Sequence, residues 1–166
     1  MDDEKDKQSD TNYQIDIEKI VNGEDTRTSL MIRNIPKGHT SEMLISEIND
    51  TQPGTLDFFY LRVKNNDRNK NVGYAFINFV APSKIVSFYQ AFNGKNWDKV
   101  ESEKVVSLAY ARVQGMQALI MEYEMKNPDA MTMDMQFRPT VFLSESQYQE
   151  ESVQYGKLNI RTHQPE

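Results

Sequence analysis

The residues whose spacing could do chemistry are two aromatics, Tyr74 and Phe76, in the octamer VGYAFINF at residues 72–79. Successive side chains of a β-strand alternate between its faces, so both rings emerge on one face, about 6.6 Å apart along the strand. Two flat rings at this spacing can stack two unpaired nucleobases. The opposite face, which must be the core, then receives Ala75, Ile77 and Phe79.

Hydrophobic periodicity indicates the elements that must position this octamer. Alternating side chains predict strands over 29–35, 57–64, 72–80 and 105–111. Helical spacing predicts one helix that begins at Thr40 or Ser41 and a second that begins at Ser83 and stops at Asn93-Gly94. The order is βαββαβ, so we expect an α+β, ferredoxin-like fold: a four-stranded antiparallel sheet with two helices on one face. The other face, which carries large side chains, then requires a partner.

The octamer also matches the signature of RNA-recognition motifs, K/R-G-F/Y-G/A-F-V-x-F/Y, at all but two positions. Val72 replaces the basic residue, and Ile77 replaces valine. Gly73 has no side chain to obstruct an approaching backbone. We therefore predict a domain that binds single-stranded RNA by base stacking and by hydrogen bonds to base edges, with phosphate contacts that position it.

Beyond the octamer, the sequence resembles the C-terminal RNA-recognition motif of the Mei-two-like family, RNA-binding proteins that regulate meiosis in fungi and development in plants. The resemblance is carried by GEDTRT (23–28), MIRNIP (31–36), DFFYL (57–61), NVGYAFINF (71–79), AFNGKNW (91–97) and YARVQG (110–115), and more weakly by RPTVF (138–142). Valine at position 72 is typical of this family, whereas Lys37-Gly38-His39 departs from it, since Asn-Lys-Tyr is common there. The resemblance implies a regulator of the meiotic programme whose RNA partners include non-coding RNA.

Further binding residues should lie on the strands beside the octamer. Met31 stands where an RNA-recognition motif usually has an aromatic, and its thioether is a weaker stacking surface. Phe58 and Tyr60 either extend the stacking to a third base or are covered by a flanking segment. Arg112 is the best placed cation, because it leaves the last strand where a bound chain would cross the sheet. The expected RNA-binding residues are Met31, Arg33, Phe58, Tyr60, Tyr74, Phe76, Asn78, Arg112 and Gln114.

Charge and periodicity divide the chain into four parts. Residues 1–26 carry a net charge of −6 and are expected to be an acidic, largely disordered segment. Residues 27–115, the RNA-recognition motif, carry +4 although the whole chain carries −6. Residues 116–143 are expected to form a helix and an extended segment packed on the domain, and residues 144–166 a flexible tail. The helix has three open roles: stiffening the side of the domain, covering the sheet face, or binding a protein partner.

Other functions are not indicated by the residue types. The chain has no cysteine, and His39 and His163 are too isolated for a metal site. Nothing resembles a nucleophile–base pair, so we expect neither catalysis nor a cofactor. No apolar run approaches the ~20 residues that span a bilayer, and the first residues lack the basic and then apolar order of a secretory signal. The absence of cysteine fits an intracellular protein, and we expect it in the nucleus or the cytoplasm.

Two alternatives to a monomeric RNA-binding domain stay open. The acidic net charge and Met31 are compatible with a protein-interaction variant of the same fold, whose sheet binds a peptide or its own C-terminal helix. Dimerisation through that helix is the other alternative to the monomer that we expect.

Overall fold

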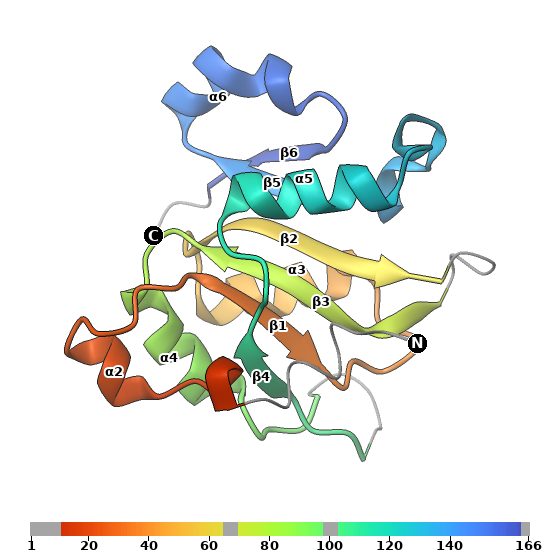
Figure 1. Ribbon diagram of the computed structural model, residues 1–166. Coiled ribbons are helices and arrows are strands. Elements are labelled where there is room, and N and C mark those ends of the chain that lie inside the picture. Colours follow the sequence, from red (N-terminus) through yellow and green to blue (C-terminus); the bar gives the residue numbers. More distant parts are fainter. Residues whose placement is uncertain (1–10, 65–69, 98–102, 164–166) are drawn as a thin grey trace.

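The central part of the chain folds in the order βαββαβ (Figure 1). The computed structural model describes residues 11–64, 70–97 and 103–163. Thr40 caps the first of the two central helices, because its hydroxyl accepts a hydrogen bond from the Met43 amide at 3.2 Å. The central elements are β1 (Ser29–Arg33), α3 (Ser41–Thr51), β2 (Leu56–Val63), β3 (Asn71–Phe79), α4 (Ser83–Phe92) and β4 (Ser107–Tyr110).

The sheet has six strands in the order β4-β1-β3-β2-β5-β6, so the prediction of four strands was wrong. The added strands are β5 (Thr140–Leu143), antiparallel to β2, and β6 (Asn159–Thr162), parallel to β5. Both are four residues long. All four residues of β5 are buried, so this strand has no alternating pattern that could have revealed it. The edge of β2, which a four-stranded sheet would leave open, is thereby paired.

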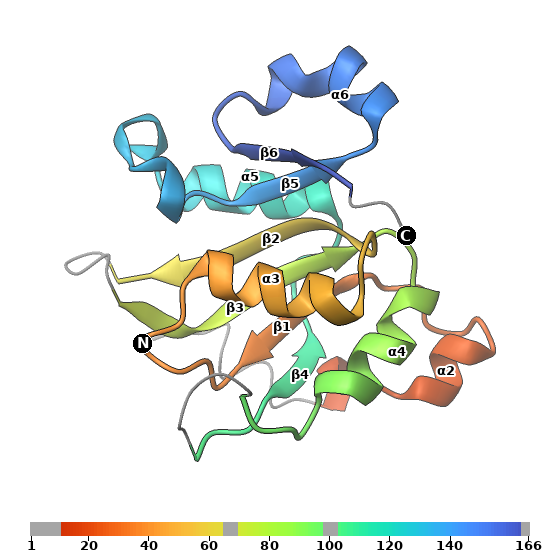
Figure 2. The same ribbon diagram turned by 180° about the vertical axis from the view of Figure 1, so that it is seen from behind.

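The main core lies between the sheet and the two helices α3 and α4, which cover one face (Figure 2). Leu30 and Ile32 of β1 point into it, as do the three core residues that were predicted in the octamer, Ala75, Ile77 and Phe79. Phe79 packs on Phe88 of α4 with ring centroids 4.9 Å apart. The alternation that was read from the octamer therefore separates core residues from face residues correctly.

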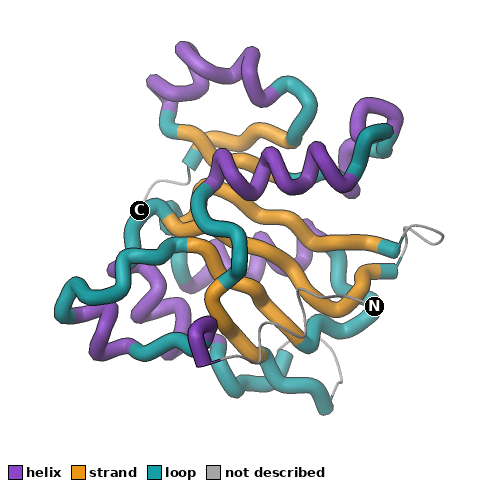
Figure 3. The backbone as a smooth tube through the Cα atoms, viewed as in Figure 1, coloured by secondary structure: helices purple, strands orange, loops and turns teal. Residues whose placement is uncertain are grey.

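The opposite face of the sheet is partly covered by α5 (Met116–Lys126) (Figures 1 and 3). The helix ends at Lys126, directly before Asn127-Pro128. It contributes Leu119, Ile120 and Tyr123 to a second apolar cluster, together with Phe58 of β2 and Val141 and Leu143 of β5. Three roles were left open for this helix, and its position corresponds to covering the sheet face. It covers that face on the side of β2 and β5.

Both flanks are more ordered than the sequence suggested. Within the supposedly disordered residues 1–26, a 3-10 turn, Thr11–Tyr13, and the helix α2 (Ile17–Val21) are formed, and Ile20 is buried in the main core. Residues 1–10 lie outside the described ranges. The expected tail contains α6 (Glu145–Glu151), the 3-10 turn Ser152–Tyr155 and β6.

The flanks fold because each finds a partner in the domain. Tyr13, Ile15 and Ile17 pack against the main core, and Tyr155 and Leu158 are buried in the second cluster. The extended segment that was expected to follow the helix within residues 116–143 contains two 3-10 turns, Ala130–Thr132 and Met135–Phe137, before the strand β5. Over the described ranges, no helix combines the length and the apolar character that crossing a membrane requires.

Candidate nucleic-acid interface

Strand pairing brings the predicted platform residues together on the face opposite α3 and α4. Phe76 of β3 lies between Met31 of β1 and Tyr60 of β2, its directly paired neighbours. Arg33 is paired with Tyr74 in the same way. Because paired residues in an antiparallel sheet point to the same side, these five side chains share one face.

The two rings of the octamer differ in how far they are exposed. Their centroids lie 5.7 Å apart, with the ring planes at 84°. Phe76 is half-buried, whereas Tyr74 is only 3% exposed. The Tyr74 hydroxyl accepts a hydrogen bond from Arg62 Nη1 at 2.8 Å. Phe76 is therefore the ring that a base can reach first, and stacking on Tyr74 requires its neighbours to move aside.

Met31 and Arg33 form the β1 side of the surface. Met31 is fully buried between β3 and β4, opposite Phe76 and Ala109, and so belongs to the floor of the face. Arg33 is half-buried and donates from Nη2 to Ser107 Oγ at 2.9 Å. Burial lowers the pKa of Arg33 from its usual high value. Its Nε is buried and has no hydrogen-bond partner among the described residues, so one donor of the guanidinium remains unused.

The helix α5 packs on the β2 side of the surface. Phe58 is 1% exposed and belongs to the second apolar cluster, beneath α5. The Tyr60 ring meets the Tyr123 ring edge to face, with centroids 5.0 Å apart. The sequence left open whether Phe58 and Tyr60 stack on a base or are covered by a flanking segment. Phe58 is covered by α5, whereas Tyr60 remains half-buried at the margin of α5.

Asn78 and Gln114 use their polar groups inside the protein. Asn78 Oδ1 accepts from the hydroxyls of Thr28 and Ser29, both at 2.7 Å. Gln114 Oε1 accepts from the amides of Thr28 and Ser29, while its Nε2 donates to the carbonyls of Ser29 and Ala111. These hydrogen bonds connect β3 and the segment between β4 and α5 to the start of β1.

This network continues to a buried carboxylate on β2. Asn78 Nδ2 donates to Asp57 Oδ1 at 2.8 Å, and Ser29 Oγ accepts from the Gly115 amide at 2.8 Å. Burial raises the pKa of Asp57 to about 6. Gly115 has φ of 95°, a left-handed conformation that favours glycine, directly before α5 begins. The residues YARVQG thus build the turn that brings α5 over the sheet.

Arg112 and the loop 37–39 lie in contrasting places. Arg112 is exposed, with its guanidinium 3.9 Å from the Glu122 carboxylate of α5. His39 is buried away from the face and contacts Trp97, with ring centroids 5.2 Å apart. Asn71 Nδ2 donates to the carbonyls of Pro36 and His39, which holds this loop against the start of β3. The unusual Lys37-Gly38-His39 loop is therefore fixed at the end of the sheet where β3 begins.

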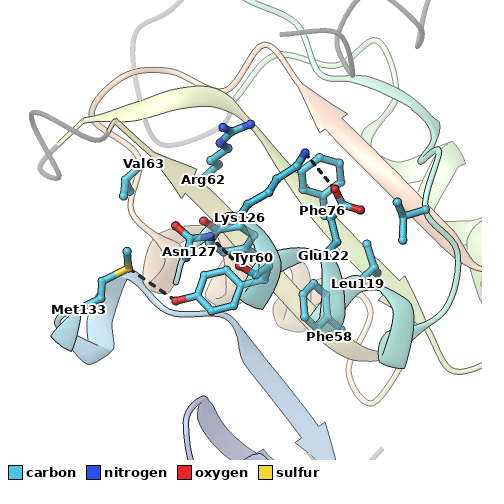
Figure 4. A pocket seen from close by; sticks show the side chains of 12 residues that line it. Phe58, Tyr60, Arg62, Val63, Phe76, Leu119, Glu122, Lys126, Asn127 and Met133 are labelled. Carbon is cyan, nitrogen blue, oxygen red and sulfur yellow. Dashed lines mark hydrogen bonds and ion pairs between the residues drawn. The ribbon is translucent and has the colours of Figure 1, made fainter. Parts of the chain in front are cut away.

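A hollow between the sheet and α5 was missed by sequence reasoning (Figure 4). Apolar spacing predicted the helix, but nothing in that spacing says which surface the helix meets. The α5 residues that line this hollow are Leu119, Glu122, Tyr123 and Lys126, followed by Asn127.

The described residues contain no group of three side chains suited to hold a metal ion.

The fold and the face define an RNA-recognition-motif domain with a folded C-terminal extension. Residues 27–124 match the model of the family RNA recognition motif 2, and the chain belongs to this family. The predicted kinship with Mei2-like proteins is confirmed. The chain is 56% identical over 133 residues to Protein MEI2-like 2 of Oryza sativa subsp. japonica, covering 80% of this chain and 15% of that protein. It is 53% identical over 131 residues to Protein MEI2-like 5 of Arabidopsis thaliana, covering 78% and 16%.

The chain thus spans about 15% of the length of such a relative. Among solved structures it is similar to the Rna15 RRM with bound RNA (GU), at a TM-score of 0.45 and 16% identity, covering 58% of this chain and 96% of that one. The two RNA-recognition domains of Sex-lethal from Drosophila melanogaster give a TM-score of 0.43 at 20% identity, covering 51% and 50%.

Proposed function

We propose that this domain binds single-stranded RNA across the face that carries Phe76, and that a base stacks on that ring. The observation that carries the proposal is the half-buried Phe76 ring, flanked by Tyr60 and Met31 through direct strand pairing. An aromatic ring on a sheet face offers a base its whole π-surface, which is worth roughly 1–3 kcal/mol per base. Tyr74 stacks a second base after Arg62 releases its hydroxyl.

Cations around the ring supply the phosphate contacts. Arg33 lies on β1 and Arg62 on β2, while Arg112 leaves β4. Residues 27–115 carry a net charge of +4. This segment can therefore attract RNA phosphates although the flanking segments are acidic. Asn78 and Gln114 act in this proposal by holding the turn into α5, and Phe58 by supporting it from below.

The experiment is a titration of the whole chain with a pool of short fluorescent RNAs, followed by anisotropy, over a series of salt concentrations. Affinity should fall as salt rises, because phosphate contacts release counterions. Phe76→Ala should weaken binding about 5- to 100-fold, the equivalent of the loss of one stacked base. Tyr148→Ala is the matched control, because Tyr148 is an exposed aromatic on α6 and lies outside the face. Equal RNA affinity of the folded Phe76 variant and the wild type would refute the proposal.

One observation favours a second candidate function. Since α5 already buries Phe58, the sheet has in part bound its own C-terminal helix. In a protein-interaction variant of the fold, this packing would be the end state, and the intact chain would bind no RNA in the titration above. Binding at low micromolar affinity or better excludes this candidate.

The wider role is proposed from the kinship alone. We propose that the protein acts in the meiotic programme, that its RNA targets include a non-coding RNA, and that it works in the nucleus or the cytoplasm as a monomer. Its C-terminal extension offers a surface for a protein partner. Recovery of RNA cross-linked to the full-length protein in meiotic cells, and sequencing of that RNA, tests the role and the target together.

A further inference from the structure

The hollow between the sheet and α5 has two unlike walls. Its sheet wall contains Tyr60, Arg62 and Phe76, and its helix wall contains Glu122 and Lys126 (Figure 4). The part of the hollow that can hold water-sized molecules measures about 80 Å³, and the hollow opens to solvent. A helix packed closely over the whole sheet face would leave no such space beside Tyr60 and Phe76.

The floor of the hollow is aromatic. Tyr60 presents its ring edge to face with Tyr123, at 5.0 Å between centroids. The Tyr123 hydroxyl points to Met133, with its oxygen 3.6 Å from the sulfur, so this ring is held from both sides. Phe76 belongs to both the platform and the hollow. A flat ligand that enters here therefore meets π-surfaces that are already fixed in place.

The rim of the hollow is polar and carries both donors and acceptors. Lys126 Nζ lies 3.0 Å from Glu122 Oε1, and these side chains remain 49% and 34% exposed. Asn127 Nδ2 donates to the Tyr123 carbonyl at 2.8 Å, which fixes the orientation of the side-chain amide. A purely apolar ligand would strip water from these groups without replacing its hydrogen bonds. A nucleobase combines a flat apolar body with donors and acceptors along its edge, and matches this arrangement.

We infer that the hollow receives one nucleobase of the bound RNA, next to the base that stacks on Phe76. Its edge is read by Glu122, Lys126 and Asn127. The inference rests on the proposed RNA binding and deepens it, because it makes α5 a wall of the RNA site. Arg62 on the opposite wall is placed to meet the phosphate of the same nucleotide. Residues outside the βαββαβ core thereby become determinants of base preference.

The first test is photo-cross-linking of the whole chain to short RNAs that carry 4-thiouridine or 6-thioguanosine, with the modified peptides identified by mass spectrometry. The inference expects cross-links in residues 116–127 of α5 as well as in β2 and β3. Cross-links confined to β1 and β3, with none in α5, would overturn it.

The second test uses two variants of the helix wall. Lys126→Met keeps the side-chain stem and removes the charged donor to the base edge, and should weaken RNA binding about fivefold. Glu122→Gln should change which base is enriched when randomised RNAs are selected on the variant. The controls are Glu124→Gln, on the exposed side of α5, and Lys84→Met on α4, behind the sheet; both should behave as wild type.

Different results would contradict the proposed RNA binding and the base site beside α5. A wild-type chain that binds no RNA removes both the proposed function and the base site. A wild-type chain that binds RNA, while both helix-wall variants keep wild-type affinity and base preference, removes the base site alone. Tighter RNA binding by Lys126→Met would also overturn the inference, because α5 would then be a cover that competes with RNA. Circular dichroism spectra equal to wild type must accompany each variant.

Discussion

Tyr60 of β2 and Tyr123 of α5 meet edge to face, with ring centroids 5.0 Å apart and the planes at 75°. This pair joins the sheet face to the helix that crosses it. Tyr123 is buried, whereas Tyr60 remains half-exposed at the margin of the hollow. The contact therefore determines how far α5 covers the face, and it connects the stability of the extension to the shape of the binding surface.

Removal of the helix half of this pair should destabilise the domain. Tyr123→Ala deletes a buried ring that contacts Tyr60 and packs among Leu119, Phe58 and Val141, so we expect a loss of about 3 kcal/mol in the free energy of unfolding. Tyr123→Phe, which keeps the ring and loses the hydroxyl that contacts the Met133 sulfur, should lose under ~1 kcal/mol. Urea titrations monitored by circular dichroism measure both. Equal stability of the alanine variant and the wild type would mean that α5 is not packed on the sheet in solution.

The Gln114 side chain should be worth more than its exposure suggests. Gln114→Ala leaves the amides of Thr28 and Ser29 and the carbonyl of Ala111 without the partner that the side chain supplies. We expect a loss of roughly 2–3 kcal/mol in unfolding free energy, the usual cost of unpaired polar groups in a partly buried site. Gln114→Glu should be at least as harmful, because a carboxylate would face the carbonyls that now accept from Nε2. Gln90→Ala, on an exposed position of α4, is the control and should change stability by less than ~0.5 kcal/mol.

The buried carboxylate of Asp57 should make stability depend on pH. Its pKa is raised to about 6 by burial, from an ordinary value of 3.8, so the folded state binds the proton more tightly than the unfolded state. The contribution of Asp57 to stability is therefore greatest at low pH and falls as pH rises from about 4 to about 6. Above that range the ionised group costs about 3 kcal/mol.

Asp57→Asn removes this ionisation while its oxygen can still accept from Asn78. The variant should be about 3 kcal/mol more stable than wild type near pH 7.5, and the difference should shrink towards pH 4. Urea titrations of both proteins at several pH values provide the measurement. A difference that stays constant over this range would show that the Asp57 carboxylate has an ordinary pKa in the folded protein.

The ring and the hydroxyl of Tyr74 should contribute differently to RNA affinity. Tyr74→Phe removes the acceptor of the Arg62 hydrogen bond and keeps the ring, so RNA affinity should stay within about twofold of wild type or rise. Tyr74→Ala removes the stacking surface and should weaken binding about 5- to 100-fold. Anisotropy titrations measure the RNA affinity of both variants. Wild-type affinity in the alanine variant would place Tyr74 outside the RNA site and leave Phe76 as the platform.

The sequence by itself determined which residues of the octamer face the core. Alternation along a strand is a local property of the backbone, so Ala75, Ile77 and Phe79 could be assigned to one side and Tyr74 and Phe76 to the other. The order of the central elements and the helix at 116–126 followed from equally local patterns. The family kinship rested on the same segments, and residues 27–124 match the family model.

Only the tertiary structure decided what covers the face. The short strand β5 has no usable pattern, because a strand buried on both sides does not alternate and its partner β2 is distant along the chain. The strand β6 is only four residues long and half-buried, so its pattern is too short to be recognised. The apolar stripe of α5 says that the helix is buried but not on what, so the fates of Phe58 and Tyr60 stayed open. Asn78 and Gln114 were predicted to bind RNA, and only the structure shows that both side-chain amides also make hydrogen bonds inside the protein. What Tyr74 and Phe76 offer to RNA therefore depends on long-range packing, which places Arg62 on one ring and opens a hollow beside the other.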